Sequence, residues 1–179
     1  MMEQVVRYQQ RNCTDRQKIE NFILRSRIGV LGMNADPFPY AVPVNYVWHQ
    51  GSIYFHGMGS GKKDEILARS PAVCFTISEE IGTVVDPVPC HADTAYMSVM
   101  VFGEAVKVTD VDDAAAVLQI LVEKLMPKYY SQSLTGKFIE KYRSSHDNKG
   151  VSVYRITPRQ MTAKENAVDP DKLFKGVIL

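Results

Sequence analysis

The pattern that most restricts the fold lies between residues 40 and 56. Apolar and aromatic side chains alternate with others along this stretch, so five of them share one face of an extended segment: Tyr40, Val42, Val44, Tyr46 and Trp48. The following His49–Gln50–Gly51 is typical of a tight turn, and Ser52–His56 is a second strand-like run. Together they predict an antiparallel β-hairpin.

Further strand-like and helical runs surround this hairpin. We expect strands at 28–33, 72–77, 95–109 and 151–156, and a long loop at 84–93. We expect helices at about 14–27 behind the capping box of Thr14–Gln17, from about 62 to just before Pro71, from Asp110 to Pro127, and around 135–142. Short strands in succession predict an all-β barrel with flanking helices, a β-dominated α+β fold. The chain is then a single domain over 1–179, with a C-terminal tail at about 158–179.

Composition excludes several classes of protein. The 21 basic and 20 acidic residues leave a formal charge of +1, which argues against a nucleic-acid partner. No apolar run approaches the roughly 20 residues that span a bilayer, and the first seven residues carry no secretory signal. Three cysteines, without C-x-x-C spacing, favour a cytoplasmic protein over a disulfide framework. For Cys90–His91 we favour a surface loop over a metal site or a thiol nucleophile.

A glycine- and lysine-rich stretch follows the second strand of the hairpin. This lysine loop, residues 57–63, reads Gly-Met-Gly-Ser-Gly-Lys-Lys and leads into a helix. Glycines allow close backbone approach, and two lysines at a helix N-terminus favour a phosphate. The spacing fits neither a Walker A loop nor the dinucleotide fingerprint G-x-G-x-x-G. The alternative is a flexible loop with two solvated lysines.

Four motifs in order give the chain a resemblance to a known family: Tyr40–Tyr46, Ile53–His56, Gly61–Lys63 and Ser98–Ala105. They resemble the flavin-binding split-barrel relatives of pyridoxamine 5'-phosphate oxidase, and most closely the nitroimidazole-resistance (Nim-type) branch. The resemblance runs from about Arg7 to about Lys164. It implies a six-stranded split barrel, a homodimer, and FMN in two clefts at the dimer interface.

The resemblance also implies roles for individual residues. The main chain of the strand that holds Val42, Pro43, Val44, Asn45 and Tyr46 would lie along the flavin ring. His56 and Gly57 would lie by the ribityl-phosphate tail, Lys62 and Lys63 would grip the phosphate, and Ser98 would offer a side chain to the flavin. Lys62 departs from the branch, in which many members have histidine at this position.

The residues themselves leave some of these roles open. His56 could handle a proton as a catalytic residue, but a structural role as a donor to phosphate or backbone is favoured. Core packing of Tyr46 and Trp48 is favoured over stacking on a ring. The Asn45 amide needs a partner, which a flavin edge or a neighbouring strand could each supply.

Three functions are compatible with this sequence. The first is an FMN-dependent oxidoreductase that reduces nitroimidazoles or similar small electron acceptors. The second is a flavin-binding protein without efficient turnover, and the third is a haem-binding relative with His56 or His91 as axial ligand. A pyridoxamine-phosphate oxidase proper is less favoured, because residues 157–179 show no matching substrate-phosphate motif.

Overall fold

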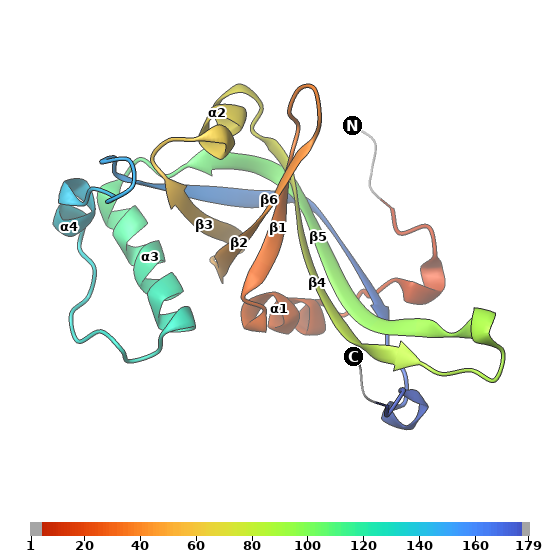
Figure 1. Cartoon of the computed structure of the whole chain (residues 1–179). Helices are drawn as coiled ribbons and strands as arrows, with labels where there is room; N and C mark the ends of the chain where they lie inside the picture. The colour runs from red at the N-terminus through yellow and green to blue at the C-terminus, as the bar shows by residue number, and fades with distance from the viewer. Residues whose placement is uncertain (1–4, 177–179) are drawn as a thin grey trace.

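The computed structural model describes residues 5–176 and contains six antiparallel strands (Figure 1). They are β1 (Ile28–Met33), β2 (Tyr40–His49), β3 (Ser52–Met58), β4 (Ala72–Val84), β5 (Asp93–Lys107) and β6 (Val151–Asn166). Their order around the closed barrel is β1-β2-β3-β6-β5-β4. The predicted six-stranded split barrel with flanking helices is therefore confirmed.

Four α-helices lie outside the barrel: α1 (Arg16–Arg25), α2 (Lys62–Arg69), α3 (Val111–Leu125) and α4 (Gly136–Lys141). Three short 3-10 turns also occur, at Gln9–Arg11, Pro89–His91 and Pro170–Lys172. The Asp110 side chain accepts from two main-chain N–H groups of α3, as predicted. At α1 the cap is Asp15 rather than Thr14, because the Asp15 carboxylate accepts from the Lys18 N–H.

The hairpin of β2 and β3 forms as the alternation predicted. Gln50 and Gly51 both have positive φ, 48° and 71°, which suits the right-handed twist of the flanking strands. Tyr46 and Phe55 are paired across the hairpin and are buried inside the barrel. Their neighbours in this first core include Leu31, Ile53, Phe75, Val99, Val101 and Ile156.

A second, smaller core lies on the outer side of the same hairpin. Here α3 packs against β2, β3 and β6 through Val47, Tyr54 and Val153, using Ala114, Val117, Leu118 and Leu121. The apolar side of α3 is therefore a packing surface, as its spacing predicts.

β4 and β6 run further than the sequence predicts, and β5 begins and ends two residues earlier than the expected 95–109. β4 continues to Val84, and β5 begins at Asp93, which pairs with Val84, so the expected loop 84–93 is shorter. β6 continues to Asn166, so residues 158–166 belong to the sheet rather than to a tail. Pro158 fits inside β6 because the register with β5 shifts next to it, as at a β-bulge.

Among residues 5–176, no helix has the length and apolar character needed to cross a membrane. The remaining positions of the predicted domain, 1–4 and 177–179, lie outside the described residues.

Candidate functional site

The barrel is split between β2 and β3. These strands pair only through residues 46–49 of β2 and 52–55 of β3. Beyond that point residues 40–45 of β2 pair with β1, whereas residues 56–58 of β3 pair with β6. The edge of β2 that faces away from β1 is therefore left without a strand partner among the described residues.

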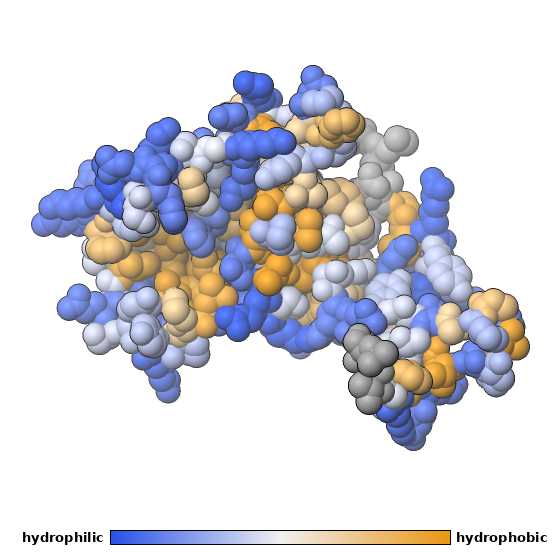
Figure 2. Space-filling model, viewed as in Figure 1, coloured by the Kyte–Doolittle hydropathy of each residue, from blue (hydrophilic) through white to orange (hydrophobic). Residues whose placement is uncertain are grey.

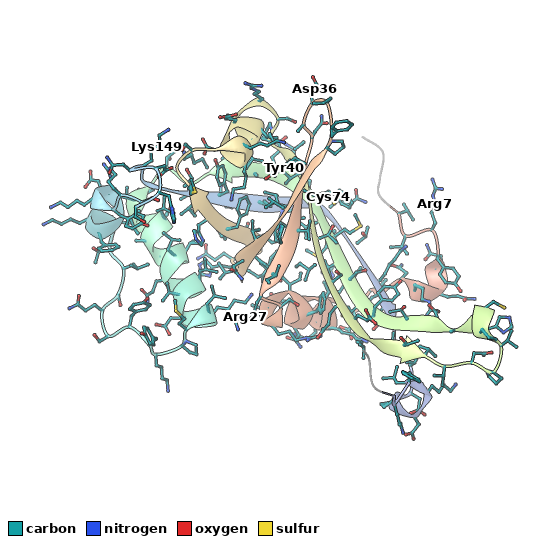
Figure 3. All side chains as sticks on the ribbon, in the orientation of Figure 1. Arg7, Arg27, Asp36, Tyr40, Cys74 and Lys149 are labelled. Atoms are coloured by element: carbon teal, nitrogen blue, oxygen red, sulfur yellow. The ribbon has the colours of Figure 1, made fainter. Side chains whose placement is uncertain are left out.

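The N-terminus of α2 lies at this split, and its two lysines point to different strands. Lys62 Nζ lies 4.5 Å from the centre of the Tyr40 ring on β2, and Figure 3 labels Tyr40 beside α2. Lys63 Nζ lies 5.4 Å from the Phe55 ring and donates to the His56 carbonyl of β3 at 3.3 Å. Two ammonium groups thus flank the opening, one at each strand.

The start of α2 also offers free main-chain donors. Its N-cap residue, Gly61, has φ 123° and no side chain to accept from the first N–H groups of the helix. These N–H groups and the positive end of the helix dipole add to the two ammonium charges. The chemistry of this donor set fits a phosphate or another small anion.

Two glycines of the lysine loop, Gly57 and Gly59, lie in close contacts that a Cβ atom would disturb. A Cβ at Gly57 would lie 2.4 Å from Lys63 Nζ, so only glycine lets this side chain lie across the strand. A Cβ at Gly59 would lie 2.3 Å from the Gly150 carbonyl oxygen. Ser60 Oγ also donates to Asp147 at 2.9 Å. These contacts order the lysine loop against residues 147–150, and Figure 3 shows Lys149 beside it.

Burial changes the acid–base properties of two groups at the split. Burial lowers the pKa of the Lys63 ammonium below its ordinary value, and the nearby Asp64 carboxylate opposes this change. Burial and then the Lys63 charge lower the pKa of His56, although its side chain still reaches solvent. Both groups therefore lose their protons more easily than they would in water, and a nearby anion would oppose this.

Asp64 fastens α2 to the barrel. Its carboxylate accepts from Tyr154 Oη and from Ser152 Oγ, the latter at 3.3 Å, and lies 3.5 Å from Lys107 Nζ. Asp64, the acidic residue next to Lys63, is therefore bound to β6 and to Lys107 of β5 instead of to Lys62 or Lys63. Sequence reasoning missed this network, since only the fold brings together residues so far apart in the chain.

The side chains of the strand predicted to lie along the flavin ring make their contacts within the chain itself. Tyr46 is fully buried and its hydroxyl donates to the Ile23 carbonyl at 2.7 Å, so the core interpretation is confirmed for it. Trp48 packs on the same core, and its indole N–H donates to Glu20. Asn45 donates to the Arg27 carbonyl at 3.1 Å, so the chain itself supplies a partner for its amide. Val42 and Val44 pack against the core, and Pro43 is exposed. Only the main-chain edge of residues 42–45 borders the split, because Tyr46 is paired with Phe55 of β3.

Ser98 lies far from the lysine loop within one chain. It sits between Ser78 of β4 and Lys164 of β6. The part of β5 that reaches α2 is its other end, at Lys107, nine residues further on. At about 3.3 Å per residue this separation is about 30 Å along the strand.

Cys90 and His91 lie at the tip of the hairpin formed by β4 and β5. Both are exposed, and His91 Nδ1 is 3.5 Å from an Asp86 carboxylate oxygen. Residues 5–176 contain no group of three or more side chains arranged to hold a metal ion. The structure thus places Cys90 and His91 in a surface loop, as predicted.

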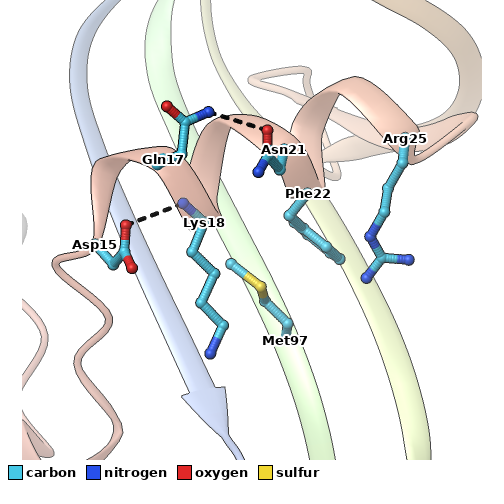
Figure 4. A pocket seen from close by; sticks show the side chains of 7 residues that line it. All are labelled: Asp15, Gln17, Lys18, Asn21, Phe22, Arg25 and Met97. Atoms are coloured by element: carbon cyan, nitrogen blue, oxygen red, sulfur yellow. Dashed lines mark hydrogen bonds between the residues drawn. The ribbon is translucent and has the colours of Figure 1, made fainter.

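A shallow depression of about 440 Å³ lies beside α1 (Figure 4). Asp15, Gln17, Lys18, Asn21, Phe22, Arg25 and Met97 line it, and none of them is a predicted site residue. Its two cations are already neutralised, Lys18 by Glu165 and Arg25 by Glu79. The split at the lysine loop is the stronger candidate, because its ammonium groups have no carboxylate partner within 4 Å among the described residues.

Comparison with known proteins places this geometry in a family. No curated protein matches the chain. Solved structures with the same fold include the flavocytochrome Anf3 from Azotobacter vinelandii, with 18% identity and a TM-score of 0.74 over 98% of this chain and 85% of that chain. A FAD- and haem-binding protein from Mycobacterium smegmatis has 16% identity and a TM-score of 0.71 over 90% and 77%. A candidate 5-nitroimidazole antibiotic resistance protein from Bacteroides thetaiotaomicron has 25% identity and a TM-score of 0.64 over 86% and 85%.

The family model described as pyridoxamine 5'-phosphate oxidase matches residues 15–165, from the start of α1 to the end of β6. The chain therefore belongs to the pyridoxamine 5'-phosphate oxidase family of split-barrel proteins.

Proposed function

We propose that this protein binds FMN at the split between β2 and β3 and works as an FMN-dependent oxidoreductase on nitroimidazoles or similar small electron acceptors. The observation that carries the proposal is the pair of ammonium groups that flank the split at the uncapped N-terminus of α2. Solved structures of the same fold that are described as FAD-binding proteins support a flavin as the cofactor class. Bound FMN would supply the redox chemistry, accepting a hydride and passing electrons to an acceptor.

The chain's own residues would bind the two ends of this cofactor. Lys62, Lys63 and the first N–H groups of α2 hold the terminal phosphate, which in FMN carries a full dianionic charge. The free main-chain edge of β2 at residues 42–45 offers donors and acceptors to the polar edge of the ring. His56, with its lowered pKa, can accept a proton on its imidazole at neutral pH, which is the role we assign to it as catalytic residue.

We further propose that the working form is a homodimer. The outer face of β1, β4 and β5 is covered by no helix among the described residues and is uncharged at its centre, where Val30, Thr76 and Met100 form a row across the strands. Val30 and Met100 are 41% and 38% exposed, and Figure 2 shows hydrophobic side chains near the middle of the molecule. A second copy on this face would cover them and could bring its Ser98 to the split.

The absorption spectrum of protein purified without added cofactor tests the cofactor. A flavin spectrum, with FMN identified after acid release, is the expected result. A Soret band would favour the haem alternative instead, and colourless protein that takes up no FMN on titration would refute the proposal.

Anaerobic stopped flow with NAD(P)H and a nitroimidazole tests the reaction. Reoxidation of the reduced flavin by the nitroimidazole over many turnovers is expected of a reductase. Flavin that binds but does not turn over with any small acceptor would leave the chain as a flavin carrier or sensor. The three free cysteines agree with the reducing, cytoplasmic setting that we propose for this activity.

A further inference from the structure

Charge is distributed unevenly along this nearly neutral chain. Residues 71–106 contain five acidic residues and no lysine or arginine, whereas residues 128–149 contain five basic and two acidic residues. The first stretch forms β4 and most of β5, and the second follows α3 and includes α4. The fold places the tip of the first and the whole of the second at opposite ends of the molecule (Figure 1).

The acidic arm, residues 78–97, is the part of the β4–β5 hairpin that leads from the edge of the barrel to the hairpin tip, and Ala95 and Met97 are its buried residues. Its four carboxylates are Glu79, Glu80, Asp86 and Asp93. Arg25 neutralises Glu79 and Arg11 neutralises Asp93, whereas Asp86 lies near His91 and accepts a hydrogen bond from the Val88 N–H. Glu80 and Asp86 have no lysine or arginine within 4 Å among the described residues. Residues 169–175, which pack on the arm, add two acidic and two basic residues and so leave the net charge of this end unchanged.

The basic segment, residues 128–149, presents exposed cations and aromatic rings. Lys128, Lys137, Lys141, Arg143 and Lys149 are all exposed, and within the described part of the chain none has a carboxylate within 4 Å. Tyr129 and Phe138 are 75% and 54% exposed, and Phe138 stacks on Tyr142. The acidic arm has exposed apolar groups of its own, since Ile81 is 55% and Val85 48% exposed. Figure 2 shows hydrophobic side chains at the tip of the arm.

We propose that the two protomers of the dimer lie antiparallel, with the acidic end of each beside the basic end of the other. The acidic arm of each protomer then lies on the basic segment of its partner. This inference rests on the homodimer proposed above. In a twofold dimer each such contact occurs twice, and opposite charges then meet at both ends. In a parallel dimer, by contrast, the like-charged ends would lie side by side.

The position of the proposed cofactor site agrees with this arrangement. The basic segment adjoins the lysine loop, because Ser60 bonds to Asp147 and Gly59 packs on Gly150. If the partner's Ser98 reaches the split, the five residues of β5 from there to Asp93 extend about 17 Å further. The tip of the arm would then pass over the lysine loop and reach the basic segment.

Charge reversal in trans tests the proposal with the full-length chain. One variant carries Glu80→Lys and Asp86→Lys on the arm, and the other carries Lys137→Glu and Lys141→Glu on the basic segment. Sedimentation of each variant alone should show a dimer Kd raised by about tenfold or more at low salt, since like charges then face each other at both contacts. Mixing the two variants should restore tight heterodimers, in which every arm again faces an opposite charge. Arg16→Glu, on α1, is the control and should leave the Kd unchanged.

The outcomes separate this inference from the proposed function. A wild-type chain that is monomeric at all concentrations would overturn both the dimer and its arrangement. A wild-type dimer that the reversals do not weaken, or variants that do not recover on mixing, would overturn the arrangement alone. Circular dichroism of each variant shows whether the fold is kept, and the combined four-substitution chain should dimerise as the wild type does.

A native cysteine gives an independent measurement. Cys90 is exposed on the arm, whereas Cys13 is buried and Cys74 half-buried, so a photoactivatable maleimide labels Cys90 selectively. In a mixture of isotopically light and heavy chains, we expect cross-links from Cys90 to residues 128–149 of the other chain. Intermolecular cross-links that avoid the basic segment would overturn the proposal.

Discussion

Two neighbouring lysines, identical in type, have different environments at the split. Lys62 is exposed above the Tyr40 ring, whereas Lys63 is half-buried across Gly57 and bonds to the His56 carbonyl. Two adjacent lysines in a sequence carry no sign of this difference. It arises because α2 begins between two strands that have diverged, so that consecutive side chains reach opposite strands.

Lys63→Ala should weaken FMN binding much more than riboflavin binding. Only FMN carries the phosphate, and loss of a charged hydrogen bond of this kind costs about 2 kcal/mol. Fluorescence titration of the apoprotein with both ligands measures the effect, with Lys172→Ala on the surface as the control. An equal loss for the two ligands would remove Lys63 from the phosphate site.

FMN affinity should also decline with rising pH before an ordinary lysine would titrate. Burial lowers the pKa of Lys63 below 10.5, and a bound phosphate would raise it again, so binding favours the protonated form. The affinity is therefore greatest below the lowered pKa and is lost as the pH rises through it. Titrations between pH 7 and 10 should show this decline for FMN and a flat profile for riboflavin. Parallel profiles would contradict the assignment.

Among the elements, α2 connects the first core to the site. Its own sequence is polar and short, and its only fully buried side chain is Leu67. The contact of Asp64 with Tyr154, Ser152 and Lys107 therefore supplies much of what holds the helix at the split. Burial alone would raise the pKa of Asp64, but these partners outweigh it and hold that pKa below its ordinary value.

Asp64→Asn should lower the free energy of unfolding by about 1–3 kcal/mol at pH 7, because a charged hydrogen-bond acceptor is lost. A carboxylate whose pKa is lowered by folding stabilises the protein above its unfolded-state pKa, and this contribution is lost as the pH falls through the folded-state pKa. The difference between the variant and the wild type in urea unfolding should therefore shrink below about pH 3.8. Asp171→Asn, at an exposed ion pair, should change stability by less than about 0.5 kcal/mol. A difference that stays constant with pH would show that Asp64 acts without its charge.

The strands differ in how well their ends could be predicted. β1 matches the expected 28–33, and β2 and β3 differ only by one or two residues at an end. The strand at 72–77 is predicted to end at Ile77, whereas β4 continues through the polar Ser78, Glu79 and Glu80 to Val84. Those residues lie where the hairpin leaves the barrel, and Ser78 and Glu80 are exposed there, so no core requires apolar side chains at their positions. The last strand is predicted to end at Ile156, and the structure continues it past Pro158 to Asn166, with a register shift between β5 and β6 next to the proline.

At the scale of the whole molecule, the proposed dimer covers the outer face of β1, β4 and β5. Met100→Glu should raise the dimer Kd by about 100-fold or more, because an unpaired charge would be buried at the interface. It should also weaken FMN binding if the partner's Ser98 completes the site. Val106→Glu makes the same change on β5 beyond the end of β4, and there we expect no effect on dimerisation. Sedimentation and FMN titration measure both variants, and a Met100→Glu chain that remains dimeric would place the interface elsewhere.

The sequence by itself determined the local features of this protein. The period-2 alternation of 40–48, the turn at 49–51 and the cap at Asp110 are each set by neighbouring residues, and the barrel class followed from them. Tertiary structure alone decided where the strands part, which lysine is buried, what holds Asp64, and how far Ser98 lies from the lysine loop. These features depend on the register between strands distant in sequence, and on the closure of six twisted strands into a barrel, which no local pattern records.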